Sequence, residues 1–150
     1  MLGELTPEQI NDVLFREVVG RIGCSAEGRT YVVPITYVFD GEGVYGHSAE
    51  GLKIRMMRAN PQVCFQVDQR QNLANWRSVV AWGVYEELHG KEAHEALQIL
   101  VARLRPLVTS ETLRLPDGPS LAAAKPVTDA PKTIIYRIRF TERTGRFEKR

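Results

Sequence analysis

The short segment YGHSAEGLKIRMMR, at residues 45–58, contains the side chains best suited to bind an anion. His47 has a ring N–H, and Lys53 carries a positive charge. Ser48 has a hydroxyl that can either cap the following helix or donate to a phosphate. The residues after Gly51 have the pattern of a short helix, which puts Lys53 in its first turn. A cation is unfavourable there, because the N-terminal end of the helix macrodipole is positive. A bound phosphate would explain Lys53, since the free backbone N–H groups of a helix start also bind phosphate.

Two arginines on the same predicted helix leave two interpretations open. Arg55 and Arg58 either assist in binding the anion or form the solvated face of the helix. The phosphate-binding motif GxxxxGK(S/T) and the dinucleotide motif GxGxxG are both missing from the sequence. The segment therefore predicts a phosphate site of a different kind.

A second polar group precedes the apolar run of NWRSVV. Asn75, Arg77 and Ser78 supply hydrogen-bonding groups, and Trp76 can stack on a planar ring. The alternative is the start of a strand that carries a half-buried tryptophan.

The segment YVVPITYVF, at residues 31–39, alternates as a strand does. One face is bulky: Tyr31, Val33, Ile35, Tyr37 and Phe39. The other face is smaller around Pro34 and Thr36, so a planar ligand fits against the backbone there. Pro34 indicates an edge strand or a bulge, because proline cannot donate to a neighbouring strand. A strand with one solvated face is the alternative.

Other chemistries find little support. The sequence has no GxSxG nucleophile motif, and its three histidines have no metal-ligand spacing with Cys24 and Cys64, so we expect no metal site and two reduced, packing thiols. Glu86 and Glu87 are adjacent on a predicted strand and therefore point to opposite faces. No catalytic residue is identified, and His47 is the only candidate acid or base.

The composition is that of a globular protein. The chain has 150 residues, of which 43% are hydrophobic and 25% charged, with a formal net charge of +2. We expect one domain over residues 1–150 and neither a nucleic-acid nor a membrane partner. The N-terminus lacks the basic start and apolar stretch of a signal peptide, so we expect a cytoplasmic protein.

The order of the predicted elements favours a mainly β fold. Helices are predicted at 6–15, 51–60 and 91–104. Strands are predicted from residue 18 onward, at 31–39, 44–48, 62–69, 76–88 and 133–141, with Gly83 marking either a bulge or a bend of the barrel. Residues 109–132 have no clear period, and we expect a functional or mobile loop. The tail from residue 141 is expected to be a solvated end. Strands mostly in succession favour an antiparallel β-barrel with peripheral helices over an alternating α/β fold.

Several segments, taken in order, resemble the flavin-binding split-barrel superfamily of pyridoxamine 5′-phosphate oxidase. Within it they are most similar to the small flavin-nucleotide-binding proteins that include the nitroimidazole-resistance (Nim-type) reductases. The segments are GRIGC, YVVPITYV, VYGHSAEGLK, NPQVCFQVD and NWRSVVAWG, which span residues 20–83.

This resemblance implies a six-stranded antiparallel split β-barrel that forms a homodimer with FMN at the interface. His47, Ser48 and Lys53 would contact the phosphate or ribityl chain. Four residues would lie along the isoalloxazine ring: Val33, Pro34, Ile35 and Thr36. A further group would meet the flavin from its other side, in this subunit or its partner: Asn75, Trp76, Arg77, Ser78 and Val79.

The resemblance further implies an oxidoreductase that passes electrons from reduced nicotinamide, NAD(P)H, through FMN to a small acceptor such as a nitroaromatic. The C-terminal W…RxxDR signature of the vitamin B6 oxidase is missing, so that reaction is not expected. Two alternatives remain: a flavin store or sensor without turnover, and a barrel that binds haem or a deazaflavin.

Overall fold

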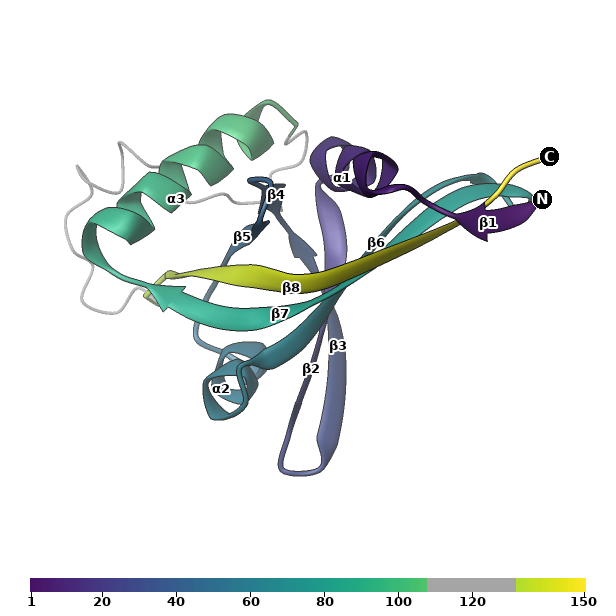
Figure 1. Cartoon of the computed structure of the whole chain (residues 1–150). Coiled ribbons are helices and arrows are strands. Elements are labelled where there is room, and N and C mark those ends of the chain that lie inside the picture. The colour runs from purple at the N-terminus through teal and green to yellow at the C-terminus, as the bar shows by residue number, and fades with distance from the viewer. Residues whose placement is uncertain (108–131) are drawn as a thin grey trace.

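One antiparallel sheet contains all the strands in residues 1–107 and 132–150, the part of the chain that the computed structural model describes. The strands are β1 (Leu2–Glu4), β2 (Val19–Ala26), β3 (Arg29–Thr36), β4 (Val38–Phe39), β5 (Gly43–Ser48), β6 (Gln62–Asn72), β7 (Asn75–Leu88) and β8 (Ile134–Glu148). Their spatial order is β3-β2-β6-β7-β8-β5-β4, and β1 pairs with β8 (Figure 1).

The sheet curls into a barrel that stays open between β3 and β5. The predicted strand at 31–39 is divided at Tyr37, where the chain leaves β2 and begins to pair with β5. The Tyr37 ring is fully buried and its hydroxyl donates to the carbonyl of Leu14 at 2.9 Å, which holds this corner in the core. The fold is therefore a split β-barrel with peripheral helices, as predicted, with short extra strands at β1 and β4.

The helices in the described residues agree with the predicted positions. They are α1 (Pro7–Arg16), α2 (Leu52–Ala59) and α3 (Gly90–Leu104), followed by a 3₁₀ turn, η1 (Arg105–Leu107). Thr6 caps α1, and Thr6 and Gln9 exchange hydrogen bonds in a capping box. Neither these helices nor any other in the described ranges is long and apolar enough to cross a membrane.

The core has two parts. The larger part fills the barrel, and its biggest fully buried side chains include Leu14, Ile22, Tyr37, Ile54, Met57, Phe65 and Tyr136. The smaller part lies under α3, where Ala96, Leu97 and Val101 pack with Ile135. The apolar faces of α1 and α2 thus face the barrel, and burial of these faces is the main stabilising contribution.

The C-terminal strand is longer than predicted. β8 pairs with β7 as far as Glu148, so the prediction of a solvated tail from residue 141 is wrong. The predicted bulge occurs between Trp82 and Gly83, where β8 contains the extra residue Thr141, whose hydroxyl donates to the carbonyl of Trp82 at 3.1 Å. Phe147, near the end of β8, packs against the core and anchors this extension.

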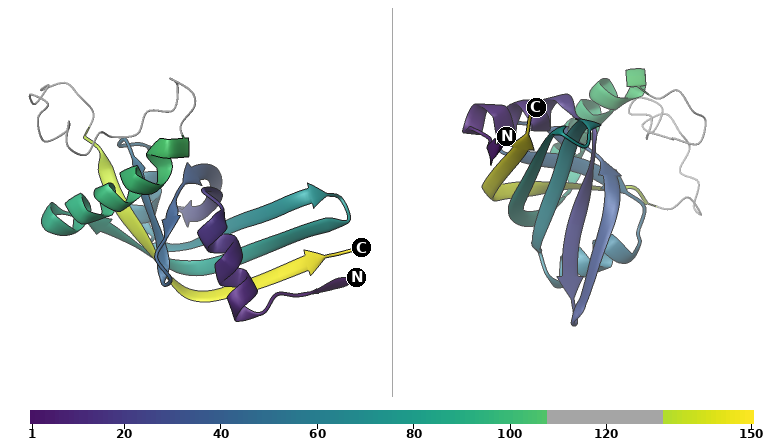
Figure 2. Two further views of the ribbon diagram at one scale, coloured as in Figure 1. Left: turned by 90° about the horizontal axis from the view of Figure 1, so that it is seen from above. Right: turned by 90° about the vertical axis from the view of Figure 1, so that its right-hand side faces the viewer.

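The far ends of β6, β7 and β8 project from the barrel, together with β1 (Figure 2). We call this projection, residues 69–77 with 1–4 and 145–149, the arm. Its hairpin tip contains Leu73, which is 82% exposed. Of the irregular segment predicted at 109–132, residues 109–131 lie outside the described part of the chain.

Candidate functional site

His47 and Lys53 lie close together at the open side of the barrel. His47 is on β5, and Lys53 is half-buried in the first turn of α2. The Nε2 atom of His47 is buried and has no hydrogen-bond partner in the described residues. Burial lowers the pKa of both side chains, and the positive charge of Lys53 lowers the pKa of His47 further. Two nitrogen groups able to contact an anion are therefore near enough for the charge of one to act on the other.

No carboxylate of the described residues forms an ion pair with Lys53. Within residues 1–107 and 132–150, the only side chain that raises its pKa is Cys24 of β2. Burial raises the pKa of the Cys24 thiol, so Cys24 is a neutral neighbour near pH 7. Cys24 and Cys64 are both free thiols, as predicted. A half-buried amine beside a neutral thiol is an incomplete electrostatic arrangement, which an anion would complete.

The start of α2 is also incomplete. Its N-cap is Gly51, no side chain caps the helix, and the first turn contains no acid. Ser48 does not cap the helix, because the N-cap position is occupied by Gly51, three residues later. The Ser48 hydroxyl donates instead to the carbonyl of Ala49 at 2.7 Å. The backbone N–H groups of the first turn thus lack a side-chain acceptor, and they lie on the same helix end as Lys53.

The β3 residues proposed as ring contacts lie on an edge strand. β3 pairs with β2 on one side and, in the described residues, with no strand on the other. Pro34 is exposed, whereas Ile35 is 6% exposed and points into the core. Val33 and Thr36 are half-buried. This segment therefore offers a ligand its backbone edge and small outer side chains, and Ile35 can contribute only its backbone.

The group around Trp76 lies at the other end of the sheet. His47 pairs with Ile135, which pairs in turn with Leu88 at the end of β7. Trp76 is twelve residues earlier on the same strand, which corresponds to about 40 Å of extended chain. Because β7 is continuous between them, one chain cannot bring Trp76 next to its own His47. The structure therefore divides the predicted site residues into two groups.

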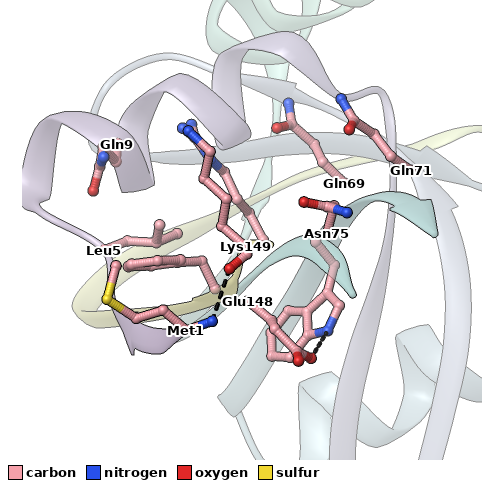
Figure 3. Close-up of a pocket in the computed structure, with 11 residues that line it drawn as sticks. Met1, Leu5, Gln9, Gln69, Gln71, Asn75, Glu148 and Lys149 are labelled. Carbon is pink, nitrogen blue, oxygen red and sulfur yellow. Dashed lines mark hydrogen bonds between the residues drawn. The ribbon is translucent and has the colours of Figure 1, made fainter. Parts of the chain in front are cut away.

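Three residues of the second group, Asn75, Trp76 and Arg77, line a groove of about 470 Å³ in the arm. Its lining residues are Met1, Leu5, Gln9, Gln69, Gln71, Asn75, Trp76, Arg77, Phe147, Glu148 and Lys149. Figure 3 shows Gln69, Gln71 and Asn75 along one side and Met1 and Leu5 along the other. The groove thus combines an amide-lined side with an apolar side, which suits a flat molecule with polar edges.

Most polar groups of this arm groove already have partners. Trp76 Nε1 donates to Glu148 Oε2 at 3.2 Å, and Arg77 lies 3.7 Å from Asp12. Ser78 lies beside the groove and accepts a hydrogen bond from Gln66 at 3.2 Å. Val79 is fully buried in the core, so its side chain cannot meet a ligand.

The sequence reasoning missed much of the arm groove. Residues from both chain ends line it, among them Met1, Phe147 and Lys149. Nothing in their local pattern links them to Trp76, since only the pairing of β1 and β7 with β8 brings them together.

A model of the family described as pyridoxamine 5′-phosphate oxidase matches residues 6–147. A FAD-binding protein from Mesorhizobium loti is similar in structure, with a TM-score of 0.77, 28% identity and coverage of 100% of this chain and 98% of that one. A Mycobacterium smegmatis FAD-binding protein has a TM-score of 0.62 at 23% identity, with 97% of each chain covered. A structure described as a 5-nitroimidazole antibiotic resistance protein, from Bacteroides thetaiotaomicron, has a TM-score of 0.71 at 19% identity over 98% of this chain and 87% of that one.

An uncharacterized protein of Rhizobium meliloti (strain 1021) is 36% identical over 84 residues. The match covers 56% of each protein, so the chain spans little more than half of this curated relative. The family match, by contrast, runs through nearly all the elements described above, from the cap of α1 to the end of β8. The chain belongs to the pyridoxamine 5′-phosphate oxidase family.

Proposed function

We propose that this protein binds FMN and acts as an oxidoreductase. The observation that carries the proposal is the pair His47 and Lys53, which lacks an acidic partner in the described residues and adjoins the uncapped start of α2. These groups fit a phosphate, which would accept hydrogen bonds from the imidazole, the ammonium group and the backbone N–H groups. The flavin-binding descriptions of similar structures support the same class of cofactor.

The remaining contacts follow from the position of β3. With the phosphate at His47 and Lys53, and Ser48 near the ribityl chain, the ring lies along the free edge of β3 at Val33, Pro34, Ile35 and Thr36. Backbone groups on this edge are available to bind the polar edge of the ring. The bound flavin supplies the redox chemistry, and the protein supplies anchoring, orientation and control of access.

We further propose that the protein is a homodimer with each flavin at the interface. We call His47, Lys53 and the uncapped start of α2 the anchor. The groove at Trp76 is too far from the anchor of its own chain to act with it, but a second copy can bring its groove to that anchor. The outer face of the sheet supports this arrangement. Val32, Gly23, Cys64 and Trp82 form one row across four strands, and Val32 and Trp82 are 66% and 42% exposed. Such a row is an apolar surface suited to a second copy.

The proposed reaction is electron transfer from reduced nicotinamide through FMN to a small acceptor, such as a nitroaromatic. The open side of the barrel leaves access for small molecules beside β3. Of the acids and bases near the anchor in the described residues, Glu50 is paired with Arg58, and the position of His47 favours phosphate binding. This reaction also implies a cytoplasmic location.

The absorption spectrum of the purified protein, followed by titration of the apoprotein, tests the proposal. We expect a flavin spectrum and tighter binding of FMN than of riboflavin, which lacks the phosphate. FAD belongs in the same titration, because its diphosphate would meet the same anchor. A haem or deazaflavin spectrum, or equal affinity for FMN and riboflavin, would contradict the proposal. Flavin binding without acceleration of NAD(P)H oxidation by any acceptor would indicate a store or sensor.

A further inference from the structure

Arg58, at the C-terminal end of α2, links three separate segments. Its Nε atom donates to Glu87 Oε1 at 2.8 Å and its Nη2 atom to Glu87 Oε2 at 3.2 Å. Its Nη1 atom donates to Glu50. One guanidinium group therefore ties α2 both to β7, through Glu87, and to the loop before α2, through Glu50. The two-point contact with Glu87 also fixes the orientation of the arginine.

The loop that contains Glu50 is part of the anchor. It connects His47 and Ser48, at the end of β5, with the first turn of α2 that carries Lys53. Its backbone therefore sets the position of Lys53 relative to His47. Because Arg58 bridges this loop and β7, it fixes the position of the loop relative to the sheet.

Glu87 is itself held in place. The Tyr85 hydroxyl donates to Glu87 Oε1 at 2.7 Å, and the hydrogen bond from Arg58 is the main reason that the pKa of Glu87 is lowered. The ring of Tyr85 packs against Tyr136, with centroids 5.6 Å apart. Tyr136 in turn lies against Gly46, where an added Cβ would come within 2.5 Å of its hydroxyl. These contacts form a continuous support from β7 to the residue before His47.

Arg58 itself is unsuited to bind the ligand directly. Two carboxylates already accept its hydrogen bonds, so its charge is balanced within the protein. Without Arg58, Glu50 would keep a negative charge beside the anchor and lose its tether. Arg55, on the same helix, is exposed and has no ion pair in the described residues. Both arginines are exposed, but of the two only Arg58 is paired with carboxylates of the described residues, so Arg58 is the one that can support the anchor.

We propose that Arg58 is a positioning residue for the phosphate anchor, acting through Glu50 and Glu87 and not by contact with the ligand. This inference rests on the proposed function and adds to it the device that fixes the spacing of His47 and Lys53. It predicts that Arg58 affects the part of the affinity that depends on phosphate. The affinity for the riboflavin part should depend little on Arg58.

The test compares Arg58→Gln with Arg55→Gln in titrations of apoprotein with FMN and with riboflavin. We expect Arg58→Gln to lower FMN affinity about three- to tenfold and to leave riboflavin affinity unchanged. The loss is modest because Lys53 is still present and only its orientation is less well fixed. Arg55→Gln should change neither affinity. Arg58→Lys, which keeps the charge but not the two-point contact, should give an intermediate loss of FMN affinity.

A second background separates positioning from general stability. In Lys53→Ala protein, Arg58→Gln should reduce FMN affinity by less than it does in the wild type, because both changes act on the same anchor. Equal losses for FMN and riboflavin, or full additivity with Lys53→Ala, would overturn the inference and indicate a general structural role. If Arg58→Gln fails to fold, the same comparisons are made with Arg58→Lys. If Lys53→Ala itself does not change the preference for FMN over riboflavin, the proposed function fails first.

Discussion

The two candidate half-sites differ in how their polar groups are satisfied. At the anchor, and within the described residues, His47 Nε2 is buried without a partner and Lys53 is paired with no carboxylate. In the arm groove, Trp76 and Arg77 both have acidic partners from the same chain. Unsatisfied buried groups cost free energy, which a ligand can recover, whereas satisfied groups gain little from a new polar contact. We therefore expect the anchor to recognise charge, and the groove to contribute shape and stacking.

This contrast predicts that changes at the two half-sites affect different parts of the same ligand. Changes at the anchor should affect FMN and spare riboflavin. Changes in the groove should affect both, because the two molecules share the ring.

The largest effect is expected from Lys53→Ala. A charge-assisted contact with phosphate contributes about 1.5–3 kcal/mol, so FMN affinity should fall about ten- to a hundredfold. The free energy of unfolding of the apoprotein should stay unchanged or rise slightly, because a cation in the first turn of a helix is unfavourable. Chemical denaturation of apoprotein and titration with FMN give the two quantities.

Lys91→Ala is a matched control. Lys91 also lies in the first turn of a helix, but it is exposed and lies 3.8 Å from Glu95. This change should leave FMN affinity intact. A Lys53→Ala protein that is less stable without ligand, yet binds FMN normally, would show that Lys53 has a structural role only.

A smaller effect is expected from Trp76→Ala in the arm groove. Loss of a stacking contact costs about 0.5–1.5 kcal/mol, so the affinities for FMN and riboflavin should both fall about two- to tenfold and by the same factor. Titration with both ligands measures this. A loss confined to FMN would contradict the division between the half-sites.

Mixing the two variants tests whether the half-sites come from different chains. In a Lys53→Ala homodimer both sites have an altered anchor, and in a Trp76→Ala homodimer both sites have an altered groove. A mixed dimer has one doubly altered site and one intact site, so random mixing should restore normal affinity in about a quarter of all sites. No restoration, with exchange of subunits verified by mass, would mean that one chain supplies the whole site.

The sequence predicted local features better than distant ones. The helix that begins near residue 6, the helix that carries Lys53 and the irregularity at Gly83 were all predicted, because helical spacing and the backbone freedom of glycine act over a few residues. The extension of β8 to Glu148 was missed for two reasons. Residues 141–146 contain no apolar side chain to form a buried face, and their pairing with β7 is a long-range contact. The sequence left open whether the Trp76 group acts in the same chain as His47 or from the partner, because a motif gives the order of residues, whereas strand register gives their distance.

The smallest expected effect concerns the pH dependence of the anchor. The pKa of His47 is lowered in the folded apoprotein, first by burial and then by the charge of Lys53. As pH falls below the ordinary histidine pKa of about 6.5, the unfolded chain therefore takes up a proton that folded His47 does not. The stability of the apoprotein should then decrease with falling pH until the lowered pKa is reached, and His47→Gln should remove this contribution.

Bound phosphate should reduce the same pH dependence, because an anion beside His47 stabilises the protonated ring and raises its pKa. Chemical denaturation of wild type and His47→Gln, each at pH 7.5 and pH 5.5, isolates His47 from the other titrating groups, of which Lys53 and Cys24 lie nearest. Comparison with and without FMN then shows whether the ligand acts on this side chain. An identical loss of stability in both proteins would mean that His47 is not held neutral at the anchor, and the contrast with the satisfied arm groove would then rest on Lys53 alone.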